Sequence, residues 1–168
     1  MHFMFNSYES FIDETLEKLA LQGISVSGLV VDHIARTTES KAEYDSLKPD
    51  LLKLGELIAE DLVGGRRVGI VRLFEPLQYR EMTIEGVELI EPVEGHPTPS
   101  AINHIEFVIS MGFNNFMANQ PATVEWDTSS MTREEYPHLK IVGFPEVKFH
   151  EATIFETVER QHRHKKEL

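Results

Sequence analysis

Two histidine-bearing segments of similar sequence constrain the fold of this chain more than any other feature. Residues 102–109, Ile-Asn-His-Ile-Glu-Phe-Val-Ile, are rich in β-branched and aromatic side chains, which predicts a strand. Residues 30–36, Val-Val-Asp-His-Ile-Ala-Arg, repeat the order of a polar residue, a histidine and an isoleucine. We interpret this echo as the mark of a duplicated structural unit.

The strand predicted around His104 has one apolar and one polar face. Side chains alternate between the faces of a strand, so Ile105 and Phe107 lie on one side. His104 and Glu106 lie on the other side. We therefore expect the first face to contact a core, and the second to contact water, a partner or a metal ion.

Turn-forming and capping residues divide residues 28–91 into a strand, a helix and three more strands. We expect Thr38 to cap that helix, Pro49 to kink or shorten it, and Pro76 to end the strand that precedes it. The second half repeats this order with a short, ragged helix. The expected strands cover 29–36, 56–63, 68–74, 81–90, 102–109, 123–127, 138–142 and 146–150, and terminal helices cover 7–22 and 152–165.

Each half offers one histidine on its first strand and one candidate ligand on its last strand. Glu88 points away from its apolar neighbours in the first half, and His150 does so in the second. The candidate metal ligands are thus His33, Glu88, His104 and His150. They can meet only if the two halves curl their sheets around a shared cavity.

The residue types restrict the metal. The chain has no cysteine, so a transition metal would need histidine and carboxylate ligands. Imidazoles with a carboxylate suit Zn, Fe(II), Ni or Mn, and the sequence does not distinguish them. Glu106 is the candidate catalytic base or hydrogen-bond partner, because it shares a face with His104, whereas Asp32 points away from His33.

Each candidate site residue also has a possible structural role. A strand histidine such as His33 can be a core residue bonded to a backbone carbonyl, and His150 can be a surface residue. Glu91 is the alternative to Glu88 if the strand register differs. Arg72 and Tyr79 could recognise an anionic or carbonyl substrate, although a surface arginine and a packed tyrosine are favoured.

Composition excludes several classes of protein. Lys and Arg total 16 against 28 Asp and Glu, a net charge of −12 that disfavours binding to nucleic acid. No apolar run approaches the roughly 18–20 residues of a membrane span, and the N-terminus lacks the features of a signal peptide. We therefore expect a cytoplasmic protein that does not bind a membrane. No serine lies in a nucleophile-elbow context.

An ordered set of motifs resembles the YecM-like family of the vicinal oxygen chelate superfamily, which includes glyoxalase I, bleomycin-resistance proteins and dihydroxybiphenyl dioxygenase. The matching motifs are Asp32-His33-Ile34, Leu73-Phe74-Glu75-Pro76, Val87-Glu88-Leu89, His104-Ile105-Glu106, Thr128-Ser129-Ser130 and Val147-Lys148-Phe149-His150. They cover nearly the whole chain. The sequence departs from the superfamily at His150, where many of its enzymes have glutamate.

The resemblance implies an α+β fold of two βαβββ modules that form a curled mixed sheet around a central cavity, with added N- and C-terminal helices. Residues 1–168 would form one such domain, with an N-terminal helical extension over 1–27, modules over 28–95 and 100–152, and a C-terminal helix over 153–168.

The resemblance also implies a metal-binding protein, and we expect a metal-dependent enzyme that holds a small oxygen-rich metabolite by two oxygens. The type of reaction is open. The alternatives are a small-molecule binding protein without catalysis and an interaction scaffold with a vestigial site. Formation of a homodimer is a further open alternative.

Overall fold

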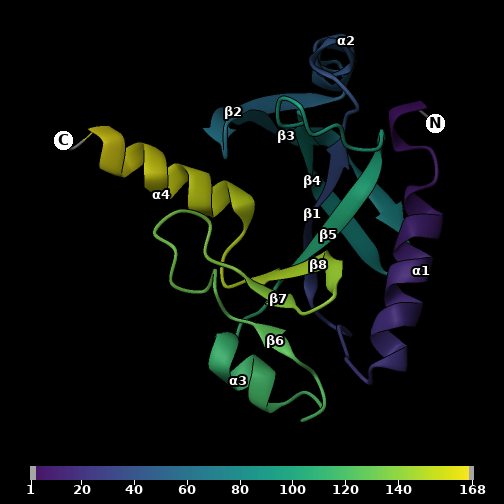
Figure 1. Cartoon of the computed structure of the whole chain (residues 1–168), viewed down its shortest axis with the longest axis vertical. Helices are drawn as coiled ribbons and strands as arrows, with labels where there is room; N and C mark the ends of the chain where they lie inside the picture. Colours follow the sequence, from purple (N-terminus) through teal and green to yellow (C-terminus); the bar gives the residue numbers. More distant parts are fainter. Residues whose placement is uncertain (1–2, 167–168) are drawn as a thin grey trace. The chain divides into compact units, whose positions relative to one another are not determined.

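Two compact units make up the chain, and the computed structural model describes residues 3–166 (Figure 1). One unit contains the segments 1–8 and 33–103, and the other contains 9–32 and 104–168, apart from the terminal residues outside the described range. The fold is α+β, with eight strands in a mixed sheet. No helix within residues 3–166 is long and apolar enough to span a membrane.

The first module has the order strand, helix and three strands. Its elements are β1 (Val30–Thr37), α2 (Lys41–Leu52), β2 (Gly55–Val63), β3 (Arg66–Tyr79) and β4 (Met82–Ile90). The strands are ordered β2-β3-β4-β1, and β4 runs parallel to β1 while the other neighbours are antiparallel. The first and last strands of the module are therefore hydrogen-bonded neighbours.

The second module repeats this topology with shorter elements. It contains β5 (Ala101–Val108), α3 (Phe113–Ala118), β6 (Trp126–Asp127), β7 (Leu139–Ile141) and β8 (Phe144–His150). Its strands are ordered β5-β8-β7-β6, and β8 runs parallel to β5. The predicted duplication and the predicted shortening of the second helix are both confirmed.

Three further helices lie outside the modules among the described residues: η1 (Phe3–Phe5), α1 (Tyr8–Leu21) and α4 (Ile154–Lys166). The terminal helices expected over 7–22 and 152–165 are thus confirmed to within two residues. The expected extension and C-terminal helix also included residues 1–2 and 167–168, which lie outside the described range.

A turn at Gly64-Gly65 joins β2 to β3. Both glycines have positive φ, 58° and 82°, which is the conformation that a two-residue hairpin of the type I′ kind requires. Val63 pairs with Arg66 across this turn. A two-residue turn sets the strand register, so the glycine pair fixes the first hairpin.

The predicted cap of α2 was wrong by two residues. Ser40 caps the helix, and its side-chain oxygen accepts a hydrogen bond from the Glu43 N–H at 3.1 Å. Thr38 instead donates from Oγ1 to the Ile90 carbonyl at 3.0 Å. Both hydroxyl residues precede the helix, and the contact between Thr38 and the end of β4 is a tertiary one that sequence pattern does not contain.

Neither proline ends its element, and a kink at Pro49 stays a prediction. The helix α2 passes through Pro49 and ends at Leu52. Strand β3 passes through Pro76 and ends at Tyr79. Pairing of β3 with β2 stops at Leu73, and the register with β4 shifts beyond Arg72, so no regular ladder hydrogen bond is needed at Pro76.

An aromatic cluster forms the core of the second module. Phe149 of β8 lies next to three other rings, at centroid distances of 4.7 Å from Phe116, 6.0 Å from Phe107 and 6.0 Å from Trp126. Phe107 belongs to the face of β5 that we predicted to be apolar, and it is buried. The opposite face of β5 carries His104 and Glu106.

Candidate metal centre

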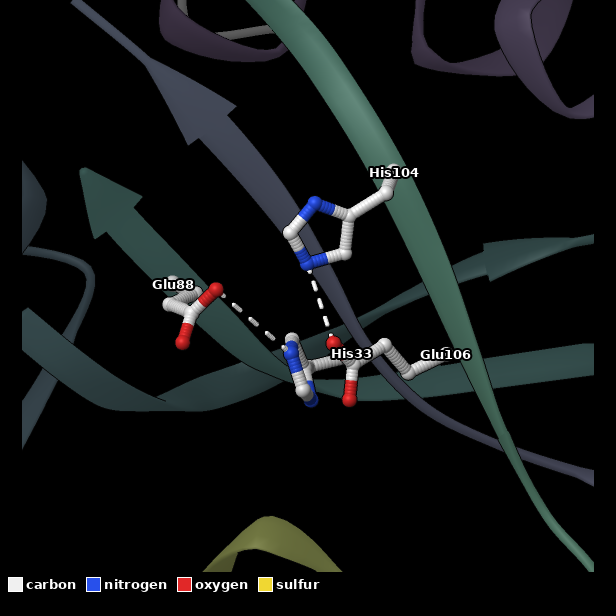
Figure 2. A group of neighbouring side chains, drawn as sticks. All are labelled: His33, Glu88, His104 and Glu106. Atoms are coloured by element: carbon white, nitrogen blue, oxygen red, sulfur yellow. Dashed lines mark ion pairs between the residues drawn. The ribbon is translucent and has the colours of Figure 1, made fainter. Parts of the chain in front are cut away.

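The first unit contributes one histidine and one carboxylate. His33 lies on β1, and Glu88 lies on β4 opposite Ala35, which is two residues further along β1 on the same face. His33 Nε2 is 3.9 Å from Glu88 Oε2 (Figure 2). The His33 side chain is 1% exposed and that of Glu88 is 15% exposed, so this pair is largely shielded from water.

The second unit contributes a denser polar cluster. His104 Nε2 lies 3.0 Å from Glu106 Oε1 on the same strand (Figure 2). The Lys148 ammonium donates to that carboxylate oxygen at 2.8 Å and lies 3.0 Å from His104 Nε2. His150 Nε2 contacts the other oxygen, Oε2, of Glu106. Glu106 is therefore the centre of the cluster and binds three cationic or potentially cationic groups.

Strand register corrects the correspondence that we drew between the modules. In the first module, Ala35 is the second residue after His33, and it pairs with Glu88. In the second module, Glu106 is the second residue after His104, and the residue opposite it is Lys148. Lys148 thus occupies the place of Glu88, and His150 lies two residue pairs further along. The carboxylate of the second module, Glu106, lies on β5 instead of β8.

Two carboxylates that neighbour the candidate ligands have structural roles. Glu91 accepts hydrogen bonds from the Arg67 side chain at 2.9 Å and from the Arg67 N–H at 2.9 Å. These bonds hold the pKa of Glu91 below its usual range. Asp32 accepts hydrogen bonds from the Ile154 N–H at 2.8 and 3.1 Å, at the start of α4. Glu91 is therefore engaged away from His33, and Asp32 stabilises a helix terminus.

A third histidine of the second unit was not among the predicted site residues. His138 is buried, and its ring lies 5.6 Å from the ring of His150. Its Nδ1 bonds the Tyr136 carbonyl at 2.7 Å, and burial lowers its pKa to about 4. His138 is therefore neutral at pH 7. The antiparallel hairpin of β7 and β8 could have indicated this contact. Leu139 pairs with Phe149 in that hairpin, which brings His138 beside His150.

The two residues considered for substrate recognition have ordinary surroundings. Arg72 is exposed on β3. The ring of Tyr79 is half-buried and lies 6.1 Å from that of Tyr8 in an edge-to-face arrangement. The favoured interpretation of a surface arginine and a packed tyrosine agrees with these positions.

The side chains that could hold a metal ion are His33 and Glu88 in the first unit, and His104 and Glu106 in the second (Figure 2). The donor set of two imidazoles and two carboxylates fits a divalent transition metal. Three of the four are buried, and Glu88 is partly exposed. Glu106, expected as a base, is one of these side chains, and His150, expected as a ligand, contacts Glu106.

A family model described as YecM protein matches residues 1–154. That match covers all elements of both modules. The chain belongs to the YecM family. Its doubled βαβββ order is the one that the resemblance to the vicinal oxygen chelate superfamily implies, so the expectation for the fold is confirmed.

Relatives within the YecM family are distant in sequence. The Protein YecM of Escherichia coli (strain K12) is 29% identical over 98 residues, which are 58% of this chain and 50% of that protein. An uncharacterised protein of Haemophilus influenzae is 26% identical over 86 residues, which are 51% of this chain and 45% of that protein. The chain thus spans about half the length of the curated relatives that it matches.

A solved structure supports the fold of this YecM family member. The structural-genomics Protein EC4020 superimposes with a TM-score of 0.71 at 22% identity, and the match covers 92% of this chain and 87% of that one. At this level of identity the likeness concerns the fold alone. The function must therefore be argued from the side chains.

Proposed function

We propose that this chain binds one divalent metal ion through His33 and Glu88 of one unit and His104 and Glu106 of the other. The observation that supports this proposal is the matched pair in each unit, one imidazole with one carboxylate, 3.9 Å apart in the first and 3.0 Å apart in the second. Buried ionisable groups of this kind are costly unless they are paired or bind a cation.

The number of ligands favours one shared ion. Each pair supplies two donor groups, whereas protein sites for transition metals commonly use three or four protein ligands. Zn, Fe(II), Ni and Mn all accept imidazole and carboxylate ligands, so the donor set does not choose among them. His33 is 1% exposed and Glu106 is 3% exposed, and such shielding strengthens the attraction between ligands and cation.

We further propose an enzyme that holds a small oxygen-rich metabolite by two neighbouring oxygens. A bound divalent ion would polarise a coordinated oxygen of such a substrate. Glu106, with His150 at its second oxygen, would orient the ligand set and exchange a proton with the reacting molecule. In the alternative assignment, His150 is a metal ligand and Glu106 is the free base.

A specific contact favours the alternative of a vestigial site in an interaction scaffold. The Lys148 ammonium already lies 2.8 Å from Glu106 and 3.0 Å from His104. A permanent cation at that place would satisfy the second pair without metal. Metal content and metal affinity separate this alternative from the proposal.

Ligand binding to metal-free and metal-loaded protein tests the proposed function. We expect 2-oxo acids or vicinal diols to raise the melting temperature of the metal-loaded chain and to leave the metal-free chain and the His33→Ala variant unchanged. Ligands that stabilise all three equally would contradict oxygen chelation. Turnover of a ligand so found would then separate an enzyme from a protein that only sequesters the ligand.

A further inference from the structure

Lys148 carries the opposite charge to its counterpart in the first module, Glu88. It lies across from Glu106 on β8, at the place that Glu88 takes across from Ala35 on β4. A ligand position of one module therefore carries an ammonium group in the other. The side chain of Lys148 is 24% exposed, so the ammonium group lies at the edge of the buried cluster.

The ammonium group contacts two donor atoms that a metal would use. Lys148 Nζ lies 3.0 Å from His104 Nε2 and 2.8 Å from Glu106 Oε1. An ammonium has three donors and no acceptor, so it can bond His104 Nε2 only when that nitrogen carries a lone pair. That is also the form in which an imidazole binds a metal. In that tautomer, Lys148 occupies the lone pair that a metal would use.

We propose that Lys148 is a built-in competitor for the metal, and that its ammonium group must leave His104 and Glu106 before both can bind the ion. This inference rests on the proposed metal site. Two cations cannot share one lone pair of His104, and like charges at close range repel strongly in a shielded site. The flexible four-carbon stem of lysine allows the ammonium group to swing toward solvent while the backbone of β8 stays in place.

Replacement of the Lys148 ammonium group by a metal ion has a defined consequence for the affinity of the chain for metal. Metal binding must overcome the charge-assisted contacts of Lys148, so the wild-type chain binds metal more weakly than a chain that lacks this ammonium group. We expect Lys148→Met to bind Zn²⁺ about 10- to 100-fold more tightly, the range that loss of one charge-assisted hydrogen bond implies. Methionine keeps the length of the side chain and removes the charge.

Calorimetric titration of metal-free protein with Zn²⁺ and with Mn²⁺ tests the proposal. Lys140 offers a matched control, because it lies opposite Lys148 on β7 and its ammonium group pairs with Asp127 at 2.9 Å. We expect Lys140→Met to bind metal like the wild type, and Lys148→Arg, which keeps the cation, to gain no affinity. Lys148→Gln serves as a second neutral variant if Lys148→Met does not fold.

Thermal unfolding gives a readout that is independent of the titration. Without metal, Lys148→Met should melt at a lower temperature than the wild type, because Glu106 loses a cationic partner. Saturating Zn²⁺ should then raise the melting temperature of the variant by more than that of the wild type.

The outcomes separate this inference from the proposed function. Equal affinity of the wild type and Lys148→Met would overturn the role of Lys148 and leave the metal site standing. Weaker binding by Lys148→Met would also overturn it, because Lys148 would then support the site. Binding of metal by neither protein would overturn both proposals.

Discussion

Glu106 is the residue on which the second half of the site depends, because its two oxygens have different partners. Oε1 faces His104 and Lys148, and Oε2 contacts His150. A carboxylate held from both sides cannot rotate without breaking one of these contacts. We propose that His150 orients Glu106 and is not itself a ligand.

Replacement of His150 tests this assignment. We expect His150→Ala to weaken Zn²⁺ binding about 10- to 100-fold, the usual effect of losing a residue that orients a ligand. His104→Ala should abolish binding, because it removes a ligand. Titration of both variants with Zn²⁺ gives the comparison. If His150→Ala abolished binding as completely as His104→Ala, His150 would be the ligand and Glu106 the base.

Sequence reasoning found most of the site residues because alternation along a strand is a local rule. It placed His104 and Glu106 on one face of β5, and it identified His33 and Glu88 in the first half. It did not find the counterpart of Glu88, because the pairing of β5 with β8 joins residues about 40 positions apart, and that register depends on tertiary packing. Lys148 was missed for this reason, and His138 was missed although the hairpin of β7 and β8 brings it beside His150.

The start of helix α4 is hydrogen-bonded to β1 through the buried carboxylate of Asp32. Asp32 accepts from the Ile154 N–H, and Thr153 and Glu156 bond each other's backbone N–H groups in a capping box. The hydrogen bonds from Thr153 lower the pKa of Glu156. The helix therefore begins at a fixed residue and has few unsatisfied N–H groups in its first turn.

Removal of the Asp32 carboxylate should affect stability and leave metal binding intact. We expect Asp32→Ala to lower the free energy of unfolding by about 1–2 kcal/mol, because the start of α4 loses an acceptor. Urea denaturation measures this loss, and Asp50→Ala, which removes an exposed acid at the end of α2, is the control. A large loss of Zn²⁺ affinity in Asp32→Ala would show that Asp32 belongs to the site after all.

The pair of Arg67 and Glu91 should make stability depend on pH. Arg67 holds the pKa of Glu91 below its usual value of 4.5, so the folded state favours the charged carboxylate. This stabilisation is complete well above pH 4.5 and is lost as the pH falls below 4.5 toward the pKa of the folded state. We expect Glu91→Gln to cost about 1–2 kcal/mol at pH 7 and less at pH 3.

Denaturant unfolding between pH 7 and pH 3 checks that expectation. The exposed Glu94→Gln variant removes the same charge from the next loop and should follow the wild type throughout. A constant difference between the wild type and Glu91→Gln over this range would mean that the Arg67 pair adds no pH-dependent stability.

At the scale of elements, the sequence predicted all eight strands and every helix of eight or more residues, because apolar periodicity and glycine turns are local signals. The errors lie where tertiary contacts override a local preference. Thr38 bonds the end of β4 instead of capping α2, and Pro76 lies within β3 where the pairing is irregular. Neither feature can be predicted from the residues that are neighbours in the sequence.

For the whole molecule, duplication explains why ligands far apart in the sequence come in matched pairs. Each module brings its first and last strands together in parallel. In the first module this places Glu88 of β4 near His33 of β1, whereas in the second His104 and Glu106 both lie on β5. The second module carries Lys148 at the strand position where the first carries Glu88. In the proposed site, one module supplies two ligands, and the other supplies two ligands and a competing cation.

Elemental analysis of chain purified without a polyhistidine tag tests the central claim most directly. We expect one divalent transition metal ion per chain in the wild type and in His96→Ala, which alters an exposed histidine outside the site. We expect none in His33→Ala or in His104→Ala, because one ion needs ligands from both modules. Metal retained in either of these variants, or two ions per wild-type chain, would contradict a single shared centre.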